Sequence, residues 1–335
     1  MQPAPVICGI GTSLPSRVVT NDDLAAELDT SDEWISTRTG IRERRIADPG
    51  TATGDLARAA GEGALKSAGD ASVDMVVLAT TTPDHRCPAT APDVAQRLGL
   101  TGVPAWDLSA VCSGFLYGLA CASSFIRAGT AERVLLIGAD TYSTILDPND
   151  RATRAIFGDG AGAVVLRAGS PAEDGAVSSV NLGSDGTLRD AILVADGGSR
   201  SPFPPGEVPG EGRYFTMRGK TVFRHAVDRM SEASRTAAES AGWDPSDIDC
   251  LVPHQANARI IQAVADRLGL PVERCASNIE RLGNTAAASI PLALADAAGS
   301  GRLRPGDRVL LTAFGGGATW GAAALTWPDV TPMAG

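Results

Sequence analysis

The sequence has 335 residues, of which 44% are hydrophobic and 20% are charged, a composition typical of a globular protein with room for two core-forming units. Its formal net charge of -10 argues against nucleic acid or an anionic membrane surface as the main partner. No apolar run approaches the roughly 20 residues of a membrane span. The N-terminus lacks a basic segment followed by a long apolar stretch, so we expect no signal peptide.

Short β-forming runs alternate with helical patterns along the chain. Strands are predicted near residues 5–12, 74–80, 103–108, 133–140, 161–167, 249–253, 307–314 and 320–327. Helices are predicted near residues 31–38, 53–68, 90–98, 113–127, 217–241, 257–268 and 285–298. We further expect a capping box at residues 30–33, a loop over residues 197–212 and a frayed tail over residues 331–335.

The six cysteines form no CxxC pair and have no regular spacing. This argues against a zinc site and against a disulfide framework, and it favours a reducing, cytoplasmic environment. We therefore expect no bound metal. A reactive cysteine has to be found from its local context.

The two halves of the sequence resemble each other. Asp74 and Asp249 occur in similar segments 175 positions apart, and so do Arg133 and Arg308. The segment Arg-Leu-Gly-Leu also occurs twice, with its arginines 170 positions apart. This pattern predicts a duplicated α/β unit in which each half builds its own mostly parallel sheet.

Cys112 lies between the predicted strand at 103–108, which we expect to be buried, and the predicted helix at 113–127. A thiol at the N-terminal end of a helix has its pKa lowered by the helix dipole and the unpaired N–H groups. Such a cysteine is a nucleophile that can carry an acyl group as a thioester. The alternative interpretation is a small thiol buried in the core.

His254 closes a predicted strand in the second half, and Asn284 opens the helix that corresponds to the one after Cys112. If the two halves pack with pseudo-symmetry, these three residues converge. A histidine and an asparagine side by side offer two N–H donors to an oxyanion, which suits decarboxylation of a malonyl thioester. Alternatively, His254 is a hydrogen-bonded strand end and Asn284 is a helix cap.

From residue 6 to about residue 327, the sequence resembles the β-ketoacyl-acyl-carrier-protein synthase III family of condensing enzymes, with a polyketide-priming member as one possibility. The matching motifs are Asp29-Thr-Ser-Asp-Glu-Trp, Ala110-Val-Cys-Ser-Gly-Phe, Asp147-Pro-Asn-Asp-Arg, Phe157-Gly-Asp-Gly-Ala-Gly, Val252-Pro-His-Gln-Ala-Asn, Gly283-Asn-Thr-Ala-Ala-Ala-Ser and Ala313-Phe-Gly-Gly-Gly. The resemblance implies a thiolase-like α/β fold with helices in layers about two mixed sheets. It implies two pseudo-symmetric βαβαβαββ halves, residues 1–170 with Cys112 and residues 171–335 with His254 and Asn284.

The resemblance also implies roles for individual residues. Cys112 is then the acyl acceptor, His254 and Asn284 the decarboxylation pair, and the N–H groups of Gly316 and Cys112 the oxyanion hole. The matching coenzyme A contacts are Trp34, Arg38, Arg151, Phe223, Asn257 and Arg259. Coenzyme A enters as a thioester substrate, so no resident cofactor is expected.

The implied activity is a decarboxylative Claisen condensation of an acyl-CoA primer with malonyl-acyl carrier protein. It gives a 3-oxoacyl-acyl carrier protein, CoA and CO2, and it initiates fatty acid or polyketide synthesis in the cytoplasm. Two alternatives remain open at this point. One is an acyltransferase of the same fold that uses its cysteine without decarboxylation, and the other is a non-catalytic thiolase-fold partner subunit.

The sequence departs from the family at Cys87. Acetyl-primed members carry a bulky aromatic residue there, which the partner subunit of a homodimer contributes to the acyl pocket. A smaller side chain deepens the pocket, so we expect a primer larger than acetyl. For docking of the acidic carrier protein, we expect a basic patch on the helices near the entrance, at Arg224, Arg229, Arg259 and Arg267.

Overall fold

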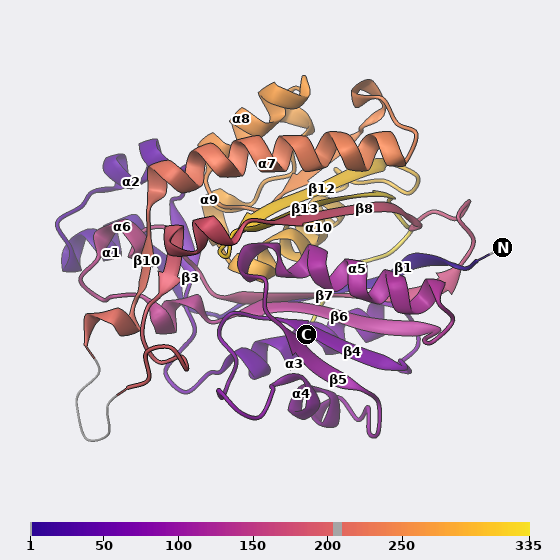
Figure 1. Cartoon of the computed structure of the whole chain (residues 1–335), viewed down its shortest axis with the longest axis horizontal. Coiled ribbons are helices and arrows are strands. Elements are labelled where there is room, and N and C mark those ends of the chain that lie inside the picture. Colours follow the sequence, from indigo (N-terminus) through magenta and orange to yellow (C-terminus); the bar gives the residue numbers. More distant parts are fainter. Residues whose placement is uncertain (1, 204–209) are drawn as a thin grey trace.

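The computed structural model describes residues 2–203 and 210–335, and it arranges them as alternating layers of helices and sheets (Figure 1). Two mixed sheets face each other across a middle layer of helices, and further helices cover the outer face of each sheet. The predicted thiolase-like α/β architecture is confirmed. Within the described residues, no helix combines the length and the apolar composition needed to cross a membrane.

The first sheet has six strands in the order β14-β1-β7-β6-β4-β5. Their bounds are β1 Ala4–Ser13, β4 Met75–Ala79, β5 Ala105–Leu108, β6 Arg133–Asp140, β7 Gly160–Gly169 and β14 Met333–Ala334. Strand β4 runs parallel to β5 and β6, whereas β7 runs antiparallel to β1 and β6. Helices α3 (Thr53–Ser67) and α4 (Ala91–Arg97) cover its outer face.

The second sheet has four strands in the order β11-β12-β13-β8, with bounds β8 Val177–Ser184, β11 Cys250–Pro253, β12 Arg308–Gly315 and β13 Thr319–Thr326. Only β11 and β12 are parallel in it, so the prediction of a mostly parallel sheet is wrong for this half. In the first sheet, three of the five strand pairs are parallel. Helices α7 (Gly219–Ser240) and α8 (Ala258–Leu268) lie on its outer face, at the top of Figure 1.

Helices α5 (Gly114–Arg127) and α10 (Ser289–Gly299) form the middle layer and contact strands of both sheets. Helix α5 is apolar on most sides, which a helix between two sheets requires. Its residues Phe115, Leu116, Leu119 and Ile126 are buried, and they share one core cluster with Val164 of the first sheet and Leu311 of the second.

The repeated sequence segments make repeated interactions. The carboxylate of Asp74 accepts the backbone N–H of Arg133 at 2.8 Å, at the start of β6. The carboxylate of Asp249 accepts the backbone N–H of Arg308 at the same distance, at the start of β12. Strands β6 and β12 begin and end 175 positions apart, so the duplication predicted from the sequence is present in the fold.

Several smaller elements were not predicted. They are α1 Asn21–Glu27, α6 Arg151–Arg154, α9 Ile279–Leu282, β2 Val18–Thr20, β3 Glu43–Arg45, β9 Ile192–Val194 and β10 Phe215–Met217, besides β8 in the second sheet. Strands β9 and β10 pair with each other, and so do β2 and β3. The expected loop over residues 197–212 is described only at its two ends, because residues 204–209 lie outside the described residues.

Three local predictions were wrong. The strand β5 is half-buried rather than buried, because it forms an edge of its sheet. The chain end is not frayed, since Met333 pairs with Gly11 and the N–H of Gly335 bonds to Thr12. Helix α2 (Asp32–Thr39) is capped by Ser31, whose hydroxyl accepts the N–H of Trp34, so no capping box begins one residue earlier.

Candidate active site

Cys112 lies in a 3₁₀ turn, Val111–Ser113, that leads directly into α5. Val111 has a φ of 48°, which a β-branched residue adopts only under strain. The Cys112 side chain is buried, and burial together with the carboxylate of Asp140 raises the pKa of its thiol. This direction is opposite to the one expected from the helix N-terminus, because loss of hydration dominates at this depth.

One cavity of about 610 Å³ brings Cys112, His254 and Asn284 together. It lies where the 3₁₀ turn Val111–Ser113 of the first half meets β11 and the turn before α10 of the second half. Its wall beside the cysteine is apolar, and its other end reaches the half-exposed and exposed residues of α2, α7 and α8. The apolar lining comprises Tyr142, Ile156, Phe157, Ile192, Phe215, Met217 and Phe314.

His254 follows the last residue of β11 and is buried. Its Nδ1 lies 2.5 Å from the hydroxyl oxygen of Ser289, the first residue of α10. Burial lowers the pKa of His254 to about 3, so the imidazole is neutral at physiological pH. A neutral ring whose Nδ1 is bonded to Ser289 presents Nε2 to the cavity as its other polar atom.

Asn284 is buried in the turn between α9 and α10. Its Oδ1 accepts the backbone N–H of Ala286 at 2.9 Å, so the side chain does satisfy a free backbone group, as the cap interpretation expected. Because the oxygen is engaged there, the Nδ2 group is directed to the cavity that Asn284 lines. Asn284 can therefore hold the backbone of the turn with its oxygen and also offer its amide N–H groups to a ligand in the cavity.

The glycine run after β12 closes on the turn that holds Cys112. A Cβ atom added to Gly315 would lie 2.8 Å from the backbone nitrogen of Cys112, so only glycine fits there. The next residue, Gly316, lies against Val111 and Ile192. Gly316 is not among the residues that line the catalytic cavity, so its predicted oxyanion role stays a prediction.

Trp34 and two arginines form a cluster at the surface on α2 and α6. The guanidinium of Arg38 lies 4.6 Å from the Trp34 ring centroid, and that of Arg151 lies 5.0 Å from it. Arg151 is also paired with Asp29. An aromatic ring beside two guanidinium groups suits a flat, phosphorylated group such as the adenine nucleotide of coenzyme A.

The other predicted coenzyme A contacts lie between this cluster and the cysteine. Phe223 is 39% exposed on α7 and lines the catalytic cavity together with Arg38, Asn257 and Arg259. The Asn257 amide donates to the carbonyl oxygen of Arg38 at 3.0 Å, and Arg259 donates to that of Thr37 at 2.9 Å. These bonds join α8 to α2 and form one rim of the cavity.

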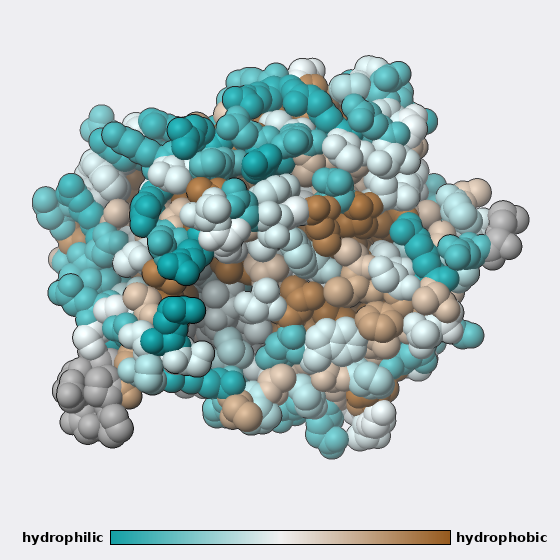
Figure 2. All heavy atoms as spheres, in the orientation of Figure 1, coloured by the Kyte–Doolittle hydropathy of each residue, from teal (hydrophilic) through white to brown (hydrophobic). Residues whose placement is uncertain are grey.

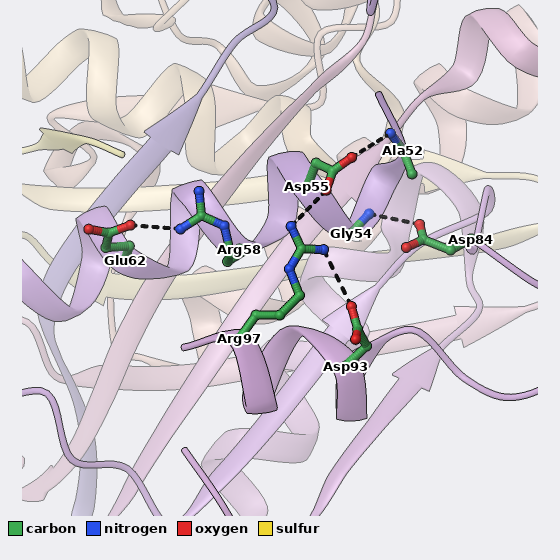
Figure 3. A network of polar contacts seen from close by, with 8 residues as sticks. All are labelled: Ala52, Gly54, Asp55, Arg58, Glu62, Asp84, Asp93 and Arg97. Atoms are coloured by element: carbon green, nitrogen blue, oxygen red, sulfur yellow. Dashed lines mark hydrogen bonds and ion pairs between the residues drawn. The ribbon is translucent and has the colours of Figure 1, made fainter. Parts of the chain in front are cut away.

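Cys87 is exposed and does not line the catalytic cavity of its own chain. It follows a segment that Asp84 fixes, because the Asp84 carboxylate accepts the N–H of Gly54 at the start of α3 at 2.8 Å. Figure 3 shows this bond beside two ion pairs of Arg97. The pair with Asp55 joins α4 to α3, and the pair with Asp93 lies within α4. The Asp84 carboxylate therefore ties the exposed Cys87 segment to the start of α3.

Two of the four predicted docking arginines are engaged within the chain. Arg229 pairs with Glu232, and Arg267 pairs with Asp228. Within the described residues, neither Arg224 nor Arg259 forms an ion pair. The basic patch is therefore smaller than the sequence suggested.

Three contributors to the site were not singled out from the sequence. Ser289 holds His254, and Asp140 lies buried at the end of β6, where burial raises the pKa of its carboxyl to about 6. Tyr142 stacks on Phe157 in the wall beside Cys112. A serine in a helix and a tyrosine after a strand carry no signal in one sequence, whereas Asp140 could have been noticed as a charge closing an apolar strand.

Comparisons with known proteins agree along the whole chain. Residues 106–186 match the family described as 3-oxoacyl-[acyl-carrier-protein (ACP)] synthase III, and residues 238–327 match the C-terminal part of that enzyme. Beta-ketoacyl-[acyl-carrier-protein] synthase III 5 of Streptomyces coelicolor is 59% identical to the chain, over 99% of the chain and 100% of that protein.

Solved structures give the same result. The 3-oxoacyl-(acyl carrier protein) synthase III of Pseudomonas aeruginosa superposes with a TM-score of 0.91 at 55% identity, covering 98% of this chain and 100% of that one. A priming β-ketosynthase from a polyketide biosynthetic pathway also has a TM-score of 0.91, at 36% identity, with coverage of 98% and 97%.

Proposed function

Because the chain belongs to the 3-oxoacyl-[acyl-carrier-protein] synthase III family and is an acyltransferase-type condensing enzyme, we propose that it condenses an acyl-CoA primer with malonyl-acyl carrier protein. The observation that carries this proposal is the single cavity that holds a buried thiol, a neutral histidine and an asparagine amide. A thiol alone suits acyl transfer in general. Two convergent N–H donors suit a reaction that also builds up charge on a thioester oxygen.

In the first half-reaction, the Cys112 sulfur attacks the thioester carbonyl of the primer. The carbon–sulfur bond to coenzyme A breaks, and coenzyme A leaves as the thiol with the proton that Cys112 loses. The product is acyl-Cys112. Since the pKa of Cys112 is raised, the proton has to leave as the new bond forms rather than before it.

In the second half-reaction, malonyl-acyl carrier protein occupies the same cavity. His254 and Asn284 donate hydrogen bonds to its thioester oxygen and stabilise the enolate formed when CO2 leaves. For this, Ser289 donates its proton to Nδ1 of His254, so that Nε2 carries the hydrogen toward the substrate. The enolate carbon attacks the carbonyl of acyl-Cys112, and the carbon–sulfur bond to Cys112 breaks to release 3-oxoacyl-acyl carrier protein. The Cys112 sulfur then takes up a proton from solvent, which restores the thiol.

The decisive experiment measures CO2 release from malonyl-acyl carrier protein together with acyl loading of Cys112. Condensation predicts that His254→Ala and Asn284→Ala abolish CO2 release while Cys112 still takes up acyl groups. Acyl transfer without decarboxylation would give loading with no CO2 from the parent enzyme. A non-catalytic partner subunit would show neither loading nor CO2.

The primer is the finer part of the proposal, and we infer that it is larger than acetyl. The support is Cys87, a small exposed side chain at the position that, in the family, the partner subunit contributes to the acyl pocket. Acyl-CoAs of four to eight carbons should then load Cys112 at least as fast as acetyl-CoA. Cys87→Phe should slow the larger primers about tenfold and spare acetyl-CoA, and a tenfold preference of the parent enzyme for acetyl-CoA would contradict the inference.

We also propose that the active form is a homodimer. The edge strand β5 and the neighbouring helix α5 leave Trp106 and Phe125 half-buried with their rings 5.6 Å apart, and Leu182 on β8 is 36% exposed. Figure 2 shows apolar side chains gathered on the face over α5 and β8, while the face over α7 and α8 is mostly hydrophilic. Sedimentation of the parent protein at twice 34.3 kDa, and of Trp106→Arg at 34.3 kDa, would support a dimer through this face.

We propose that the carrier protein docks on the two rim arginines that form no ion pair within the described residues, Arg224 and Arg259. Arg259 lies on α8 at the mouth of the cavity, and Arg224 lies on α7 beside Phe223. At low salt, Arg224→Glu should raise the KM for malonyl-acyl carrier protein and leave loading from acyl-CoA unchanged. Arg259→Glu should weaken both steps, because Arg259 is also a predicted coenzyme A contact. Arg304→Glu provides a matched charge control, because Arg304 is exposed, lies in the loop before β12 and does not line the cavity.

A further inference from the structure

A second cavity of about 720 Å³ adjoins the catalytic one, and three residues line both: Tyr142, Ile192 and Phe215. These residues therefore form a shared wall between the two spaces. Ile192 and Phe215 come from the small β9–β10 sheet, and Tyr142 comes from the turn after β6. Cys112 belongs to the same apolar cluster as Tyr142 and Phe215, so the wall lies next to the reacting sulfur.

Tyr142 brings a polar atom into this apolar wall. The residue is 1% exposed, and its ring is fixed by Phe157, stacked at 4.4 Å and 13°, and by Phe215, edge-on at 5.3 Å. Burial raises the pKa of Tyr142 well above its usual range, so the hydroxyl keeps its proton and remains a donor. Two aromatic contacts leave the ring little freedom to move the hydroxyl elsewhere.

Among the described residues, none forms a hydrogen bond with the Tyr142 hydroxyl, nor is that oxygen fully enclosed by protein. Neighbouring hydroxyls behave differently. Thr53 bonds to Thr82 at 3.0 Å and to Thr141 at 2.8 Å, just behind the wall. A buried hydroxyl without a partner is unfavourable unless something in the cavity completes its hydrogen bond.

We propose that Tyr142 is a specificity-determining residue that donates a hydrogen bond to an oxygen on the acyl primer, close to the thioester. The primer class is then a short acyl chain with a hydroxyl or keto oxygen at about the third carbon. This inference rests on the proposed function, because it concerns the group that Cys112 accepts. An alkyl primer of the same size would fill the space and leave the hydroxyl unpaired.

The test compares two primers of nearly equal shape, 3-hydroxybutyryl-CoA and isovaleryl-CoA, which differ by a hydroxyl in place of a methyl group. The readout is the rate at which Cys112 gains each acyl mass without malonyl-acyl carrier protein. The parent enzyme should load the better 3-hydroxybutyryl enantiomer about tenfold faster than isovaleryl. Tyr142→Phe should remove this preference by slowing 3-hydroxybutyryl loading and leaving isovaleryl loading unchanged or faster.

Tyr117→Phe is the matched control, because that hydroxyl donates to Gly183 on β8 and lines neither cavity. A purely structural role of Tyr142 would lower both loading rates together and so would overturn the inference. So would equal loading of the two primers by the parent enzyme, a result that needs no variant. Loading of isovaleryl without any preference overturns only this inference, whereas no loading of any acyl-CoA overturns the proposed function with it.

Discussion

The two turns that lead into helices α5 and α10 have the same backbone conformation but differ in nearly every functional side chain. Val111 has a φ of 48° and Ala286 a φ of 46°; they are the two non-glycine residues with positive φ in the described part of the chain. They lie 175 positions apart, and each is the first residue of the 3₁₀ turn that leads into α5 or α10. The next residue is Cys112 in the first turn and Ala287 in the second.

The difference extends to the strand ends beside each turn. The second half places His254 and Ser289 where the first half, 175 positions earlier, has Ala79 and Gly114. Ala79 lies close to Gly114, where an added Cβ would approach it to 3.1 Å. One copy of the duplicated frame thus supplies the thiol, and the other supplies the histidine and the group that orients it.

The two halves also differ at the ends of strands β6 and β12, where one half has a carboxylate and the other has a glycine. Asp140 ends β6 and accepts the backbone N–H of Ala287 at 3.0 Å. The corresponding residue at the end of β12 is Gly315, which lies against the N–H of Cys112 but has no side chain to accept it. In the second half, a carboxylate therefore accepts the N–H of Ala287, whereas in the first half the corresponding position has no side chain to accept the N–H of Cys112. This is the N–H that we predict to bind a substrate oxygen.

Replacing Cys112 by alanine makes the two turns alike and should have the largest effect. Without the sulfur no acyl-enzyme forms, so condensation should fall by about a thousandfold or more. Intact-mass measurement after incubation with acyl-CoA checks this, with Cys121→Ala on α5 as the control. An acyl adduct that persists in Cys112→Ala would place the acyl group on another residue.

Gly315→Ala tests whether acyl loading depends on the lack of a side chain beside the N–H of Cys112. The added Cβ would lie 2.8 Å from the Cys112 nitrogen and 3.0 Å from the Ala110 oxygen, and both are backbone atoms that cannot move aside cheaply. We expect acyl loading to fall about a hundredfold, with a loss of stability of about 1–3 kcal/mol. Loading kinetics and urea unfolding measure the two effects.

The control for that variant is Gly299→Ala at the end of α10, where an added Cβ meets nothing within 4 Å. It should be neutral or stabilise the protein slightly, because alanine favours helix more than glycine does. Unchanged loading in Gly315→Ala would show that the approach of β12 to Cys112 has no role in catalysis.

Ser289→Ala makes the second helix start resemble the first, which has Gly114. His254 would lose the partner of its Nδ1, and the tautomer that donates through Nε2 would no longer be favoured. We expect CO2 release from malonyl-acyl carrier protein to fall about tenfold while acyl loading stays within about twofold. Since the pKa of His254 is about 3, neither rate should show a histidine titration between pH 5 and 8.

This comparison also shows how far the sequence alone could reach. The repeat of Asp74 and Arg133 in the second half predicted the duplicated fold, because those residues fix the start of β6 and β12 in both copies. The convergence of Cys112, His254 and Asn284 followed from the same duplication. Strands with continuous apolar runs, such as β4 and β7, were placed to within about two residues.

The failures have physical causes. The thiol pKa was assigned the wrong direction because local sequence reports the helix start but not the depth at which Cys112 is buried. The prediction of a frayed tail is wrong because the pairing partner of Met333, β1, lies more than 300 residues away in the chain. Tyr142 and Ser289 were missed since their importance depends on contacts that only the assembled halves create.

Asp140→Asn should have the smallest effect on the reaction, and its main effect should be on stability. The Oδ1 atom accepts hydrogen bonds from Thr80, Thr81 and Thr82, and Oδ2 accepts the N–H of Ala287. An asparagine can keep the first set, but it turns an NH2 group toward the N–H of Ala287. The turn before α10 would then lose its acceptor, at about 1–3 kcal/mol.

The pH dependence of the free energy of unfolding distinguishes the loss of the Asp140 carboxyl group from a general disruption of packing. Burial raises the pKa of Asp140 from 3.8 to about 6, so the protonated form is favoured in the folded state. Its stabilising contribution is therefore full below about pH 4 and is lost as the pH rises through 6, by at most about 3 kcal/mol. Urea unfolding from pH 4 to 7 should show the deficit of Asp140→Asn shrinking as pH rises. Parallel curves for parent and variant would mean that Asp140 stays ionised throughout, and that its bond to Ala287 alone accounts for the difference between the two turns.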